Sequence, residues 1–274
     1  MESQLKHNVK SVAFLFICTK NYADYCQNAI FSLIKNVKVQ DNFLVKFHIF
    51  TDKPESFVHL RNDLKPPWYF QTHKIDSYGW PEATLLRFKI INDFKQHLKE
   101  DYLIYLDSDM LAISNFDLDE ILVKDINLVA FCPHPGYYIS GGILKRFILI
   151  VTKKRFLISL MRSLGSRANC FGAWEENKSS LAYVPTKERR IYVHGAIFSS
   201  SRKTFLNMCS ILENRINRDL ENRYIAIWHD ESHLNWYFSQ FSGELLSSKF
   251  STYGKYRDTM KKNPKIITVE KPNR

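Results

Sequence analysis

Short apolar runs alternate along the first hundred residues or so with longer segments in which apolar residues recur every three or four positions. The runs predict strands at Val12–Thr19, Phe43–Thr51, Trp68–Ile75 and Asp101–Leu106, and a helix follows the first strand to about Asn36. Strands that alternate with helices favour an α/β fold with a single, mostly parallel sheet flanked by helices.

A further helix is predicted to start at about Pro81, because proline suits the first helical turn. It carries an apolar stripe at helical spacing, formed by Leu85, Phe88, Ile91, Phe94 and Leu98. No internal repeat or linker is evident, so we expect one domain over residues 1–274. It would carry a basic, apolar insertion at about 140–170 and a basic tail at about 255–274.

The insertion combines apolar side chains with six lysines and arginines between Ile143 and Leu164, and no acidic residue occurs between Asp125 and Glu175. Too many charges interrupt it for a membrane-spanning helix. Two interpretations stay open: a basic amphipathic helix on a membrane surface, and an inserted helix packed on the domain with a solvated basic face.

Composition narrows the classes of partner. The 274 residues are 45% hydrophobic and 24% charged, as in a globular protein, and 39 Lys+Arg against 28 Asp+Glu give a net charge of +11. This charge favours nucleotide phosphates, nucleic acid or an acidic membrane surface. No nucleic-acid-binding motif accompanies it, so nucleic acid is the least favoured of the three.

The 5 cysteines are scattered, without CxxC spacing, which disfavours a zinc site or a disulfide framework and indicates a reducing compartment. The first residues have no apolar signal core, and the run from Val12 is too short to cross a bilayer. We therefore expect a cytoplasmic protein, soluble or peripheral on the inner face of the cytoplasmic membrane.

Asp107 and Asp109 directly follow the predicted strand at Asp101–Leu106, with Ser108 between them. In an extended segment, residues two apart point to the same side, so both carboxylates could bind one hard divalent ion. Such an ion could hold a diphosphate beyond the strand ends. An ordinary loop with a helix cap is the alternative.

A second candidate site is Trp228-His229-Asp230-Glu231-Ser232, where an aromatic ring, an imidazole and two carboxylates precede a helical pattern. Such a group could place the ring on a sugar face and a carboxylate near the reacting carbon. Acidic residues in a first helical turn are also ordinary partners of the helix dipole.

An ordered series of motifs resembles glycosyltransferase family 6, the family of the ABO blood-group transferases and α1,3-galactosyltransferase, and in particular its bacterial members without a membrane anchor. It extends from about Val12 to Lys271. The motifs are GWPEATLLRF (79–88), DYLIYLDSDM (101–110), HPGYY (134–138), WEENKSSLAYVP (174–185), YVHGAIF (192–198) and IWHDESHLNWYF (227–238).

The resemblance implies a GT-A fold and transfer of Gal or GalNAc from a UDP-sugar to a sugar hydroxyl, with retention and an α1,3 linkage. Asp107 and Asp109 would hold Mn²⁺, with Mg²⁺ as the alternative, and Glu231 would be the catalytic carboxylate. His134 and Trp228 match acceptor-binding positions. The donor-binding positions that it implies are Phe16, Ile17, Cys18, Tyr22, Arg87, Asp107, Ser108, Asp109, His194, Gly195, Ala196, Asp230 and Lys271.

Three features bear on the details. Both aspartates of the metal-binding pair are present, whereas many bacterial relatives carry asparagines, so we expect metal dependence. His194 and Ala196 look more like the galactosyl members than the GalNAc members. The segment Ser247–Tyr253 lacks the acidic residue that binds an acceptor galactose in the family. The insertion is also longer than the corresponding loop of the mammalian members, so the resemblance leaves the identity of the acceptor open.

Two other functions stay open from the sequence. One is a different retaining GT-A hexosyltransferase of lipopolysaccharide or surface-glycan assembly, acting on a glycan or lipid-linked glycan. The other is a catalytically silent protein that binds a membrane surface. The silent protein would not need Asp107, Asp109, Asp230 and Glu231 together.

Overall fold

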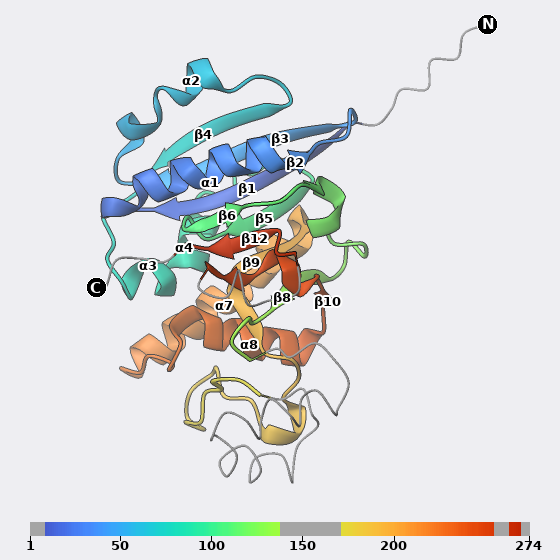
Figure 1. Ribbon diagram of the computed structural model, residues 1–274. Coiled ribbons are helices and arrows are strands. Elements are labelled where there is room, and N and C mark those ends of the chain that lie inside the picture. The colour runs from blue at the N-terminus through green and yellow to red at the C-terminus, as the bar shows by residue number, and fades with distance from the viewer. Residues whose placement is uncertain (1–8, 138–170, 255–262, 270–274) are drawn as a thin grey trace, which may run out of the picture.

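The computed structural model describes residues 9–137, 171–254 and 263–269 (Figure 1). Within these residues, the largest sheet has seven strands in the order β10-β8-β9-β5-β1-β3-β4. Its strands are β1 (Lys10–Cys18), β3 (Phe43–Thr51), β4 (Trp68–Lys74), β5 (Tyr102–Leu106), β8 (Val129–Pro133), β9 (Val193–Ser201) and β10 (Glu244–Leu245).

The sheet is mostly parallel, as the sequence predicts. Strand β1 pairs in parallel with both β3 and β5, and β3 pairs in parallel with β4. Strand β9 is the exception, because it runs antiparallel to β5 and β8. This mixed α/β arrangement is consistent with a GT-A fold.

Helices cover both faces of the sheet. They are α1 (Ala23–Asn36), α2 (Leu60–Asp63), α3 (Glu82–Leu85), α4 (Arg87–Asp93), α7 (Arg202–Glu221) and α8 (His229–Phe241). Short 3-10 helices are η1 (Lys20–Tyr22), η2 (Pro54–Phe57), η3 (Leu118–Ile121), η4 (Thr186–Glu188) and η5 (Ser248–Phe250). Figure 1 shows α1 across one face of β1 and β3, and α7 and α8 near β8 and β9.

Alternation along β1 explains the two layers of core. Phe14 and Phe16 point into a cluster with α1, whereas Leu15 and Ile17 point into a second cluster with α4, α7 and α8. Successive side chains of a strand face opposite sides of a sheet, so a strand buried on both faces is apolar at every position. This accounts for the continuous apolar run in the sequence.

Smaller sheets support the edge where the candidate residues lie. One joins β6 (Met110–Ala112) with β11 (Thr252–Tyr253) and β12 (Ile266–Thr268), and another joins β2 (Val37–Lys38) with β7 (Phe116–Asp117). Strand β12 pairs antiparallel with β6. The end of the described chain therefore lies beside the segment that follows Asp109.

The helix predicted from Pro81 differs from the observed structure. It is broken at Leu86 into α3 and α4, and α4 ends at Asp93 rather than continuing to Leu98. The apolar stripe is nevertheless buried, since Leu85, Phe88 and Leu98 all lie in the core. The apolar residues keep helical spacing on both sides of the break at Leu86, so their pattern alone does not reveal that the helix is interrupted.

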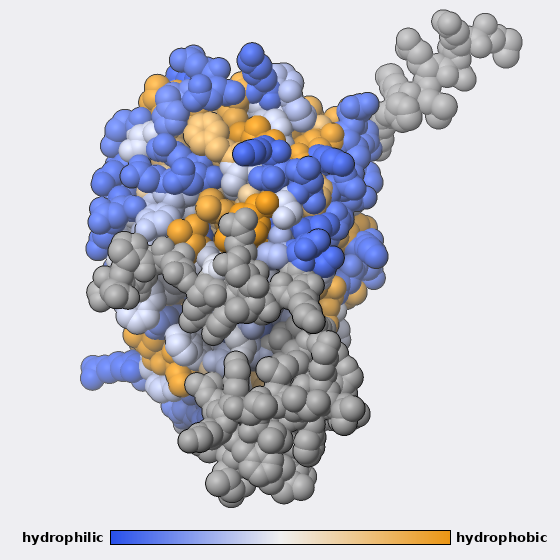
Figure 2. Space-filling view, in the orientation of Figure 1, coloured by the Kyte–Doolittle hydropathy of each residue, from blue (hydrophilic) through white to orange (hydrophobic). Residues whose placement is uncertain are grey.

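On the face shown in Figure 2, the described surface is mostly hydrophilic, with smaller apolar areas between the polar ones. Among the described residues, no helix is both long enough and apolar enough to cross a membrane. The segment from Ile143 to Leu164, for which a membrane-surface helix was one interpretation, lies outside the described residues.

Candidate functional site

A cavity of about 400 Å³ lies where the end of β5, the start of β9 and the first turn of α8 meet. That volume falls within the roughly 300–1,000 Å³ usual for small-molecule sites. It brings together ten of the residues singled out from the sequence: Arg87, Asp107, His134, His194, Gly195, Ala196, Trp228, His229, Asp230 and Glu231.

Asp107 lies just past the end of β5, in a tight turn. The backbone N–H of Met110 donates to the carbonyl of Asp107 at 3.1 Å, so Asp107 to Asp109 are not in the extended conformation expected from the sequence. The Oδ1 atom of Asp107 accepts hydrogen bonds from the Tyr105 hydroxyl at 2.8 Å and from Arg87 at 3.2 Å. The carboxylate is thus held in place at the cavity wall.

Asp109 and Ser108 lie behind that wall, and both are buried. The Ser108 hydroxyl donates to the carbonyl of Ile17 at 3.2 Å, which ties the turn to the end of β1. The backbone carbonyl of Asp109 accepts from the N–H of Val269 at 2.8 Å, so the chain after β12 passes next to the turn.

The other predicted donor-binding residues of the first strand and its following loop do not line the cavity. Phe16 is 0% exposed and packs against Phe47, and Cys18 is also buried, so neither residue is accessible to a ligand in this structure. Tyr22 lies in η1, with its ring centroid 5.6 Å from that of Tyr25. Lys271 lies outside the described residues.

Arg87 is the buried cation of the site. It forms an ion pair with Asp230 at 3.0 Å, donates to the carbonyl of Gly195, and lies over the ring of Tyr105 at 4.2 Å from its centroid. Burial acts to lower the pKa of Arg87, but Asp230 together with Tyr105 and Asp107 raises it above its usual value. Arg87 therefore links the turn after β5 to α8 as a permanent positive charge.

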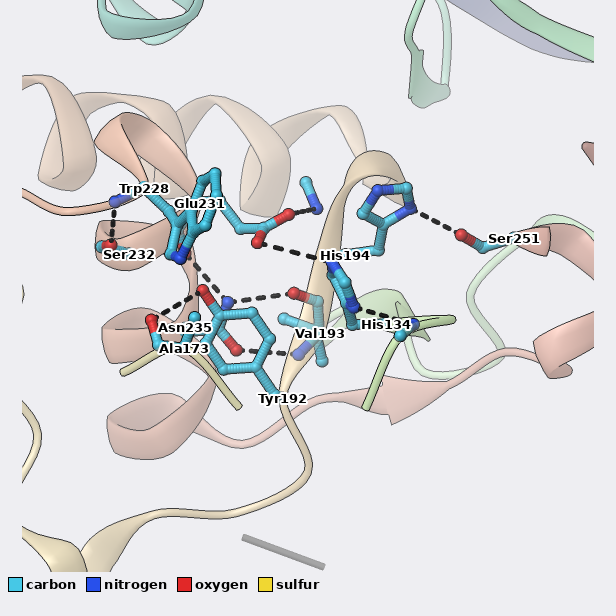
Figure 3. Close-up of polar contacts among 12 residues, drawn as sticks. His134, Ala173, Tyr192, Val193, His194, Trp228, Glu231, Ser232, Asn235 and Ser251 are labelled. Carbon is cyan, nitrogen blue, oxygen red and sulfur yellow. Dashed lines mark hydrogen bonds and ion pairs between the residues drawn. The ribbon is translucent and has the colours of Figure 1, made fainter. Parts of the chain in front are cut away.

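Glu231 projects from the first turn of α8 towards the start of β9 (Figure 3). Its Oε2 atom accepts a hydrogen bond from the N–H of Gly195 at 2.8 Å. Burial raises the pKa of Glu231 to about 7 against the lowering effect of Gly195, and burial also raises the pKa of Asp230 to about 6. Perturbed carboxylates in a cavity are typical of functional sites.

Gly195 allows this close contact between β9 and α8. A Cβ atom at this position would lie 3.3 Å from Oε2 of Glu231 and 3.5 Å from a nitrogen of Arg87. The contact with Arg87 is an ordinary one, but the contact with Glu231 is tight, so a side chain here would require the Glu231 carboxylate to shift by a few tenths of an ångström. The sequence prediction placed Gly195 in a stretch that selects the donor sugar, and its role in seating Glu231 was not foreseen.

His134, directly after β8, and His194, in β9, lie close to Glu231. Burial lowers the pKa of His134 to about 2 and that of His194 to about 3, so both imidazoles are neutral. The Nε2 atom of His134 lies 3.9 Å from Oε1 of Glu231, and Nδ1 of His194 lies 2.6 Å from the Ser251 hydroxyl. Both rings are therefore oriented at the cavity.

Among the described residues, these two histidines and Glu231 form the group of side chains that could hold a metal ion, with their ligand atoms within 4.8 Å of one another. The ring of His134 is less suited to this. Its Nδ1 atom accepts the N–H of Gly136 at 3.1 Å, which places the proton on Nε2, the atom nearest Glu231. In this tautomer, Nε2 of His134 carries a proton and offers no lone pair to a metal ion.

Residues to which the sequence prediction gave no role in the site complete the cavity wall. They are Trp80, Thr84, Tyr137 and Tyr253. Trp80 and Trp228 are 61% and 47% exposed, so each presents a ring to solvent at the cavity. Trp80, Thr84 and Tyr137 fall inside quoted motifs, which was the available signal.

The segment Ser247–Tyr253, noted above for its missing acidic residue, contributes two polar contacts instead. The Ser251 hydroxyl bonds to His194, and the Tyr253 hydroxyl lies 3.3 Å from Nε2 of His134. This segment therefore orients both histidines.

The loop before α8 is held by Glu175, which is buried. Its carboxylate accepts hydrogen bonds from the Tyr224 hydroxyl at 2.9 Å and from the N–H of Ile227 at 2.8 Å. A buried carboxylate with several donors fixes the backbone that it binds. Trp228 follows directly, and His229, the first residue of α8, has a left-handed backbone conformation with φ of 49°.

The sequence is similar to known glycosyltransferases. The family model described as "Glycosyltransferase family 6" matches residues 165–268. The chain is 27% identical over 232 residues to the globoside α-1,3-N-acetylgalactosaminyltransferase 1 of Gallus gallus, a match that covers 83% of this chain and 57% of that protein. It is 23% identical over 264 residues to the O-antigen biosynthesis glycosyltransferase WbnI of Escherichia coli, covering 95% and 94%.

A third similar protein is the histo-blood group ABO system transferase 2 of Rattus norvegicus, 24% identical over 197 residues, covering 70% of this chain and 49% of that protein. The chain thus spans about half the length of the vertebrate relatives and nearly the whole length of the bacterial one.

Proposed function

We propose that the chain is a glycosyltransferase of family 6 and that it transfers galactose, or else N-acetylgalactosamine, from a UDP-sugar to a sugar hydroxyl; the family match over residues 165–268 and the similarity to three glycosyltransferases support this. The anomeric configuration is retained, and the product carries an α1,3 linkage. The observation that carries this proposal is the convergence of Arg87, Asp107, Asp230 and Glu231 on one cavity.

Glu231 is the proposed catalytic carboxylate. As the bond from the anomeric carbon to the UDP oxygen breaks, positive charge develops at that carbon, and an adjacent carboxylate stabilises it or bonds to it. The contact from Gly195 fixes one oxygen of Glu231 and leaves the other facing His134. Asp230, paired with Arg87, is proposed to accept hydrogen bonds from donor-sugar hydroxyls.

Asp107 and Asp109 are the proposed ligands of a divalent ion, Mn²⁺ or Mg²⁺. Carboxylate oxygens suit these hard cations, and Asp107 lies at the cavity wall with Oδ1 already fixed by Tyr105 and Arg87. When bound, the ion would neutralise negative charge on the leaving diphosphate. The passage of Val269 beside Asp109 supports a role for the following tail, including Lys271, at the same phosphates.

Galactose is the preferred donor in this proposal. His194 and Ala196 both line the cavity, and Ala196 is almost fully buried. The exposed rings of Trp228 and Trp80, with His134, form the proposed wall for a glycan acceptor, because sugar rings present apolar faces to aromatic side chains.

The test is a transfer assay with UDP-Gal and UDP-GalNAc, a panel of sugar and lipid-linked sugar acceptors, and Mn²⁺ or EDTA. We expect an α-linked product, identified by NMR coupling constants, faster turnover with UDP-Gal, and loss of activity in EDTA. Glu231→Gln should lower kcat by about 100-fold or more, whereas the exposed control Glu55→Gln should not.

The outcomes separate the parts of the proposal. A β-linked product contradicts retention, full activity in EDTA contradicts the metal ion, and a strong preference for UDP-GalNAc contradicts the galactose assignment. A protein that binds but never turns over any donor would instead fit the catalytically silent alternative.

A further inference from the structure

Asn235 lies on α8 one helical turn after Glu231, and its side chain is almost fully buried. It faces the start of β9, the strand that provides His194, Gly195 and Ala196 to the cavity (Figure 3). The sequence prediction assigned this residue no role, and it does not line the cavity.

The side-chain amide of Asn235 forms hydrogen bonds with the backbone of two residues, Val193 and Glu231. Its Oδ1 atom accepts the N–H of Val193 at 2.7 Å, and its Nδ2 atom donates to the carbonyl of Val193 at 2.9 Å. The same Nδ2 atom donates to the carbonyl of Glu231 at 2.9 Å. One side chain thus binds both polar groups of Val193, as a residue in a neighbouring strand would, and also the backbone of Glu231.

These bonds lie next to the hydrogen bond between Gly195 and Glu231, on which the proposed chemistry depends. Two residues beyond Val193, the N–H of Gly195 holds Oε2 of Glu231 at 2.8 Å. Glu231 can therefore keep that bond only while α8 stays at its present distance from the start of β9. Among the contacts drawn in Figure 3, the Asn235 amide joins these two elements one helical turn from Glu231.

We propose that Asn235 is a positioning residue: it fixes the first turn of α8 against the start of β9, and so holds the Glu231 carboxylate at the reacting end of the donor sugar. This rests on the proposed function of Glu231. Asn235 itself touches neither substrate nor the reacting atoms. A buried amide whose bonds are all made is well suited to this, because losing it leaves buried backbone groups without partners.

Two variants test the proposal, Asn235→Leu and the milder Asn235→Ser. The matched controls are Asn36→Leu and Asn36→Ser. Asn36, which is partly buried, makes the two donated bonds elsewhere: its Nδ2 atom donates to the carbonyl of Ser32, four residues earlier in α1, and to that of Ala112 in β6, both at 2.9 Å. The controls therefore report the cost of losing an amide that joins a helix to a strand away from the cavity.

We expect kcat to fall by about 10- to 100-fold in folded Asn235 variants, as a catalytic group shifts by a fraction of an ångström or more. The affinity for UDP without a sugar, measured by calorimetry with Mn²⁺ present, should stay within about threefold of the parent. The Asn36 controls should keep kcat within about threefold at matched loss of thermal stability.

A second readout does not depend on activity. Hydrogen exchange at the backbone amide of Gly195, which Asn235 does not touch, should be faster in the Asn235 variants and unchanged in the Asn36 variants. Unchanged exchange at Gly195 in a folded Asn235→Ser protein, or an equal loss of kcat in the Asn36 controls, would overturn the proposal.

The two readouts also separate this inference from the proposed function. If the parent protein transfers no sugar, the proposed function fails, and exchange at Gly195 still decides whether Asn235 holds the contact. If the parent is active and Gly195 exchange rises without any loss of kcat, then Asn235 holds the backbone but does not position a catalytic group, and the proposal is wrong.

Discussion

At the scale of single residues, the first turn of α8 concentrates negative charge in a place where water is largely excluded. Asp230 and Glu231 are adjacent in the sequence, and both have pKa values raised by burial, to about 6 and about 7. Arg87 compensates only part of this charge, because it contacts Asp230 and Asp107 directly and Glu231 less closely. The ionised form of Glu231 therefore destabilises the folded protein.

This conflict predicts that Glu231→Gln stabilises the fold at alkaline pH. The pKa of Glu231 is raised from 4.5 to about 7, so its favourable contribution is full below about pH 4.5 and is lost as the pH rises through 7. Denaturant unfolding should show the variant gaining about 1–3 kcal/mol over the parent between pH 5 and pH 8.

The exposed control Glu55→Gln should show no such trend with pH. A gain for Glu231→Gln that is the same at both pH values would contradict the explanation, since it would then arise from packing rather than ionisation. Sites whose chemistry works against stability are common in enzymes.

At the scale of elements, strands β3 and β4 are joined by a buried chain of polar side chains away from the cavity. The Nδ1 atom of His48 lies 2.8 Å from Nε2 of His73, and Nε2 of His48 lies 3.1 Å from Glu100. Lys46 and His97 face the same group. Burial lowers the pKa of His73 to about 3. Burial acts to raise the pKa of Glu100, but His48, a backbone hydrogen bond and Lys46 together lower it to about 2.

We expect these buried polar side chains to make the stability of the fold sensitive to acid. Both folded pKa values lie below the unfolded ones, so the stabilisation is complete above about pH 6.5 and is lost as the pH falls towards 3. The free energy of unfolding should therefore decrease over that range in circular dichroism melts. A His48→Phe/His73→Phe double variant should show a shallower decrease, and an equal slope in both proteins would contradict the assignment.

The elements also show how far the sequence could predict the structure. The strands β1, β3, β4 and β5 were predicted to within two residues at each end, because buried strands produce apolar runs that end at polar turns. The break at Leu86 was missed, since α3 and α4 pack on the same core and keep one apolar spacing. The turn at Asp107 was missed because a hydrogen bond from Met110 closes it, which the identity of the residues does not specify.

The residues of the candidate site could be predicted where they are charged and lie within motifs. They could not be predicted where their role depends on a contact between distant parts of the chain. Asp230, Glu231 and Arg87 stand out by charge within motifs, and the structure brings them together. Asn235 is a common residue in a helix, and only its contact with a strand 42 positions away in the sequence gives it significance. Such long-range pairing depends on the whole fold and leaves no local pattern.

At the scale of the whole molecule, the cavity lies between segments from distant parts of the chain. The turn after β5, the start of β9, the first turn of α8 and the segment around Tyr253 all contribute to its wall. A ligand that binds such a site contacts all these segments at once, and binding to the folded form alone shifts unfolding to a higher temperature.

The thermal stability of the protein should therefore rise with UDP only when a divalent ion is present. At a UDP concentration of 100 times Kd the expected gain is about 2.7 kcal/mol. Differential scanning calorimetry with Mn²⁺ or with EDTA measures it, and Asp107→Asn should abolish the difference. An equal shift in EDTA would mean that Arg87 and the basic charge suffice to bind the diphosphate.

The reversed direction of β9 has a consequence for protein engineering. Its ladder with β5 begins only at Ile197, which pairs with Leu106. His194 to Ala196 precede that pairing, yet lie in the cavity wall. A designer could therefore exchange His194 or Ala196 to seek a new donor sugar while the paired half of the strand keeps its register. Gly195 sets the limit of that freedom, since an added methyl group at this position would make a tight contact with the carboxylate of Glu231.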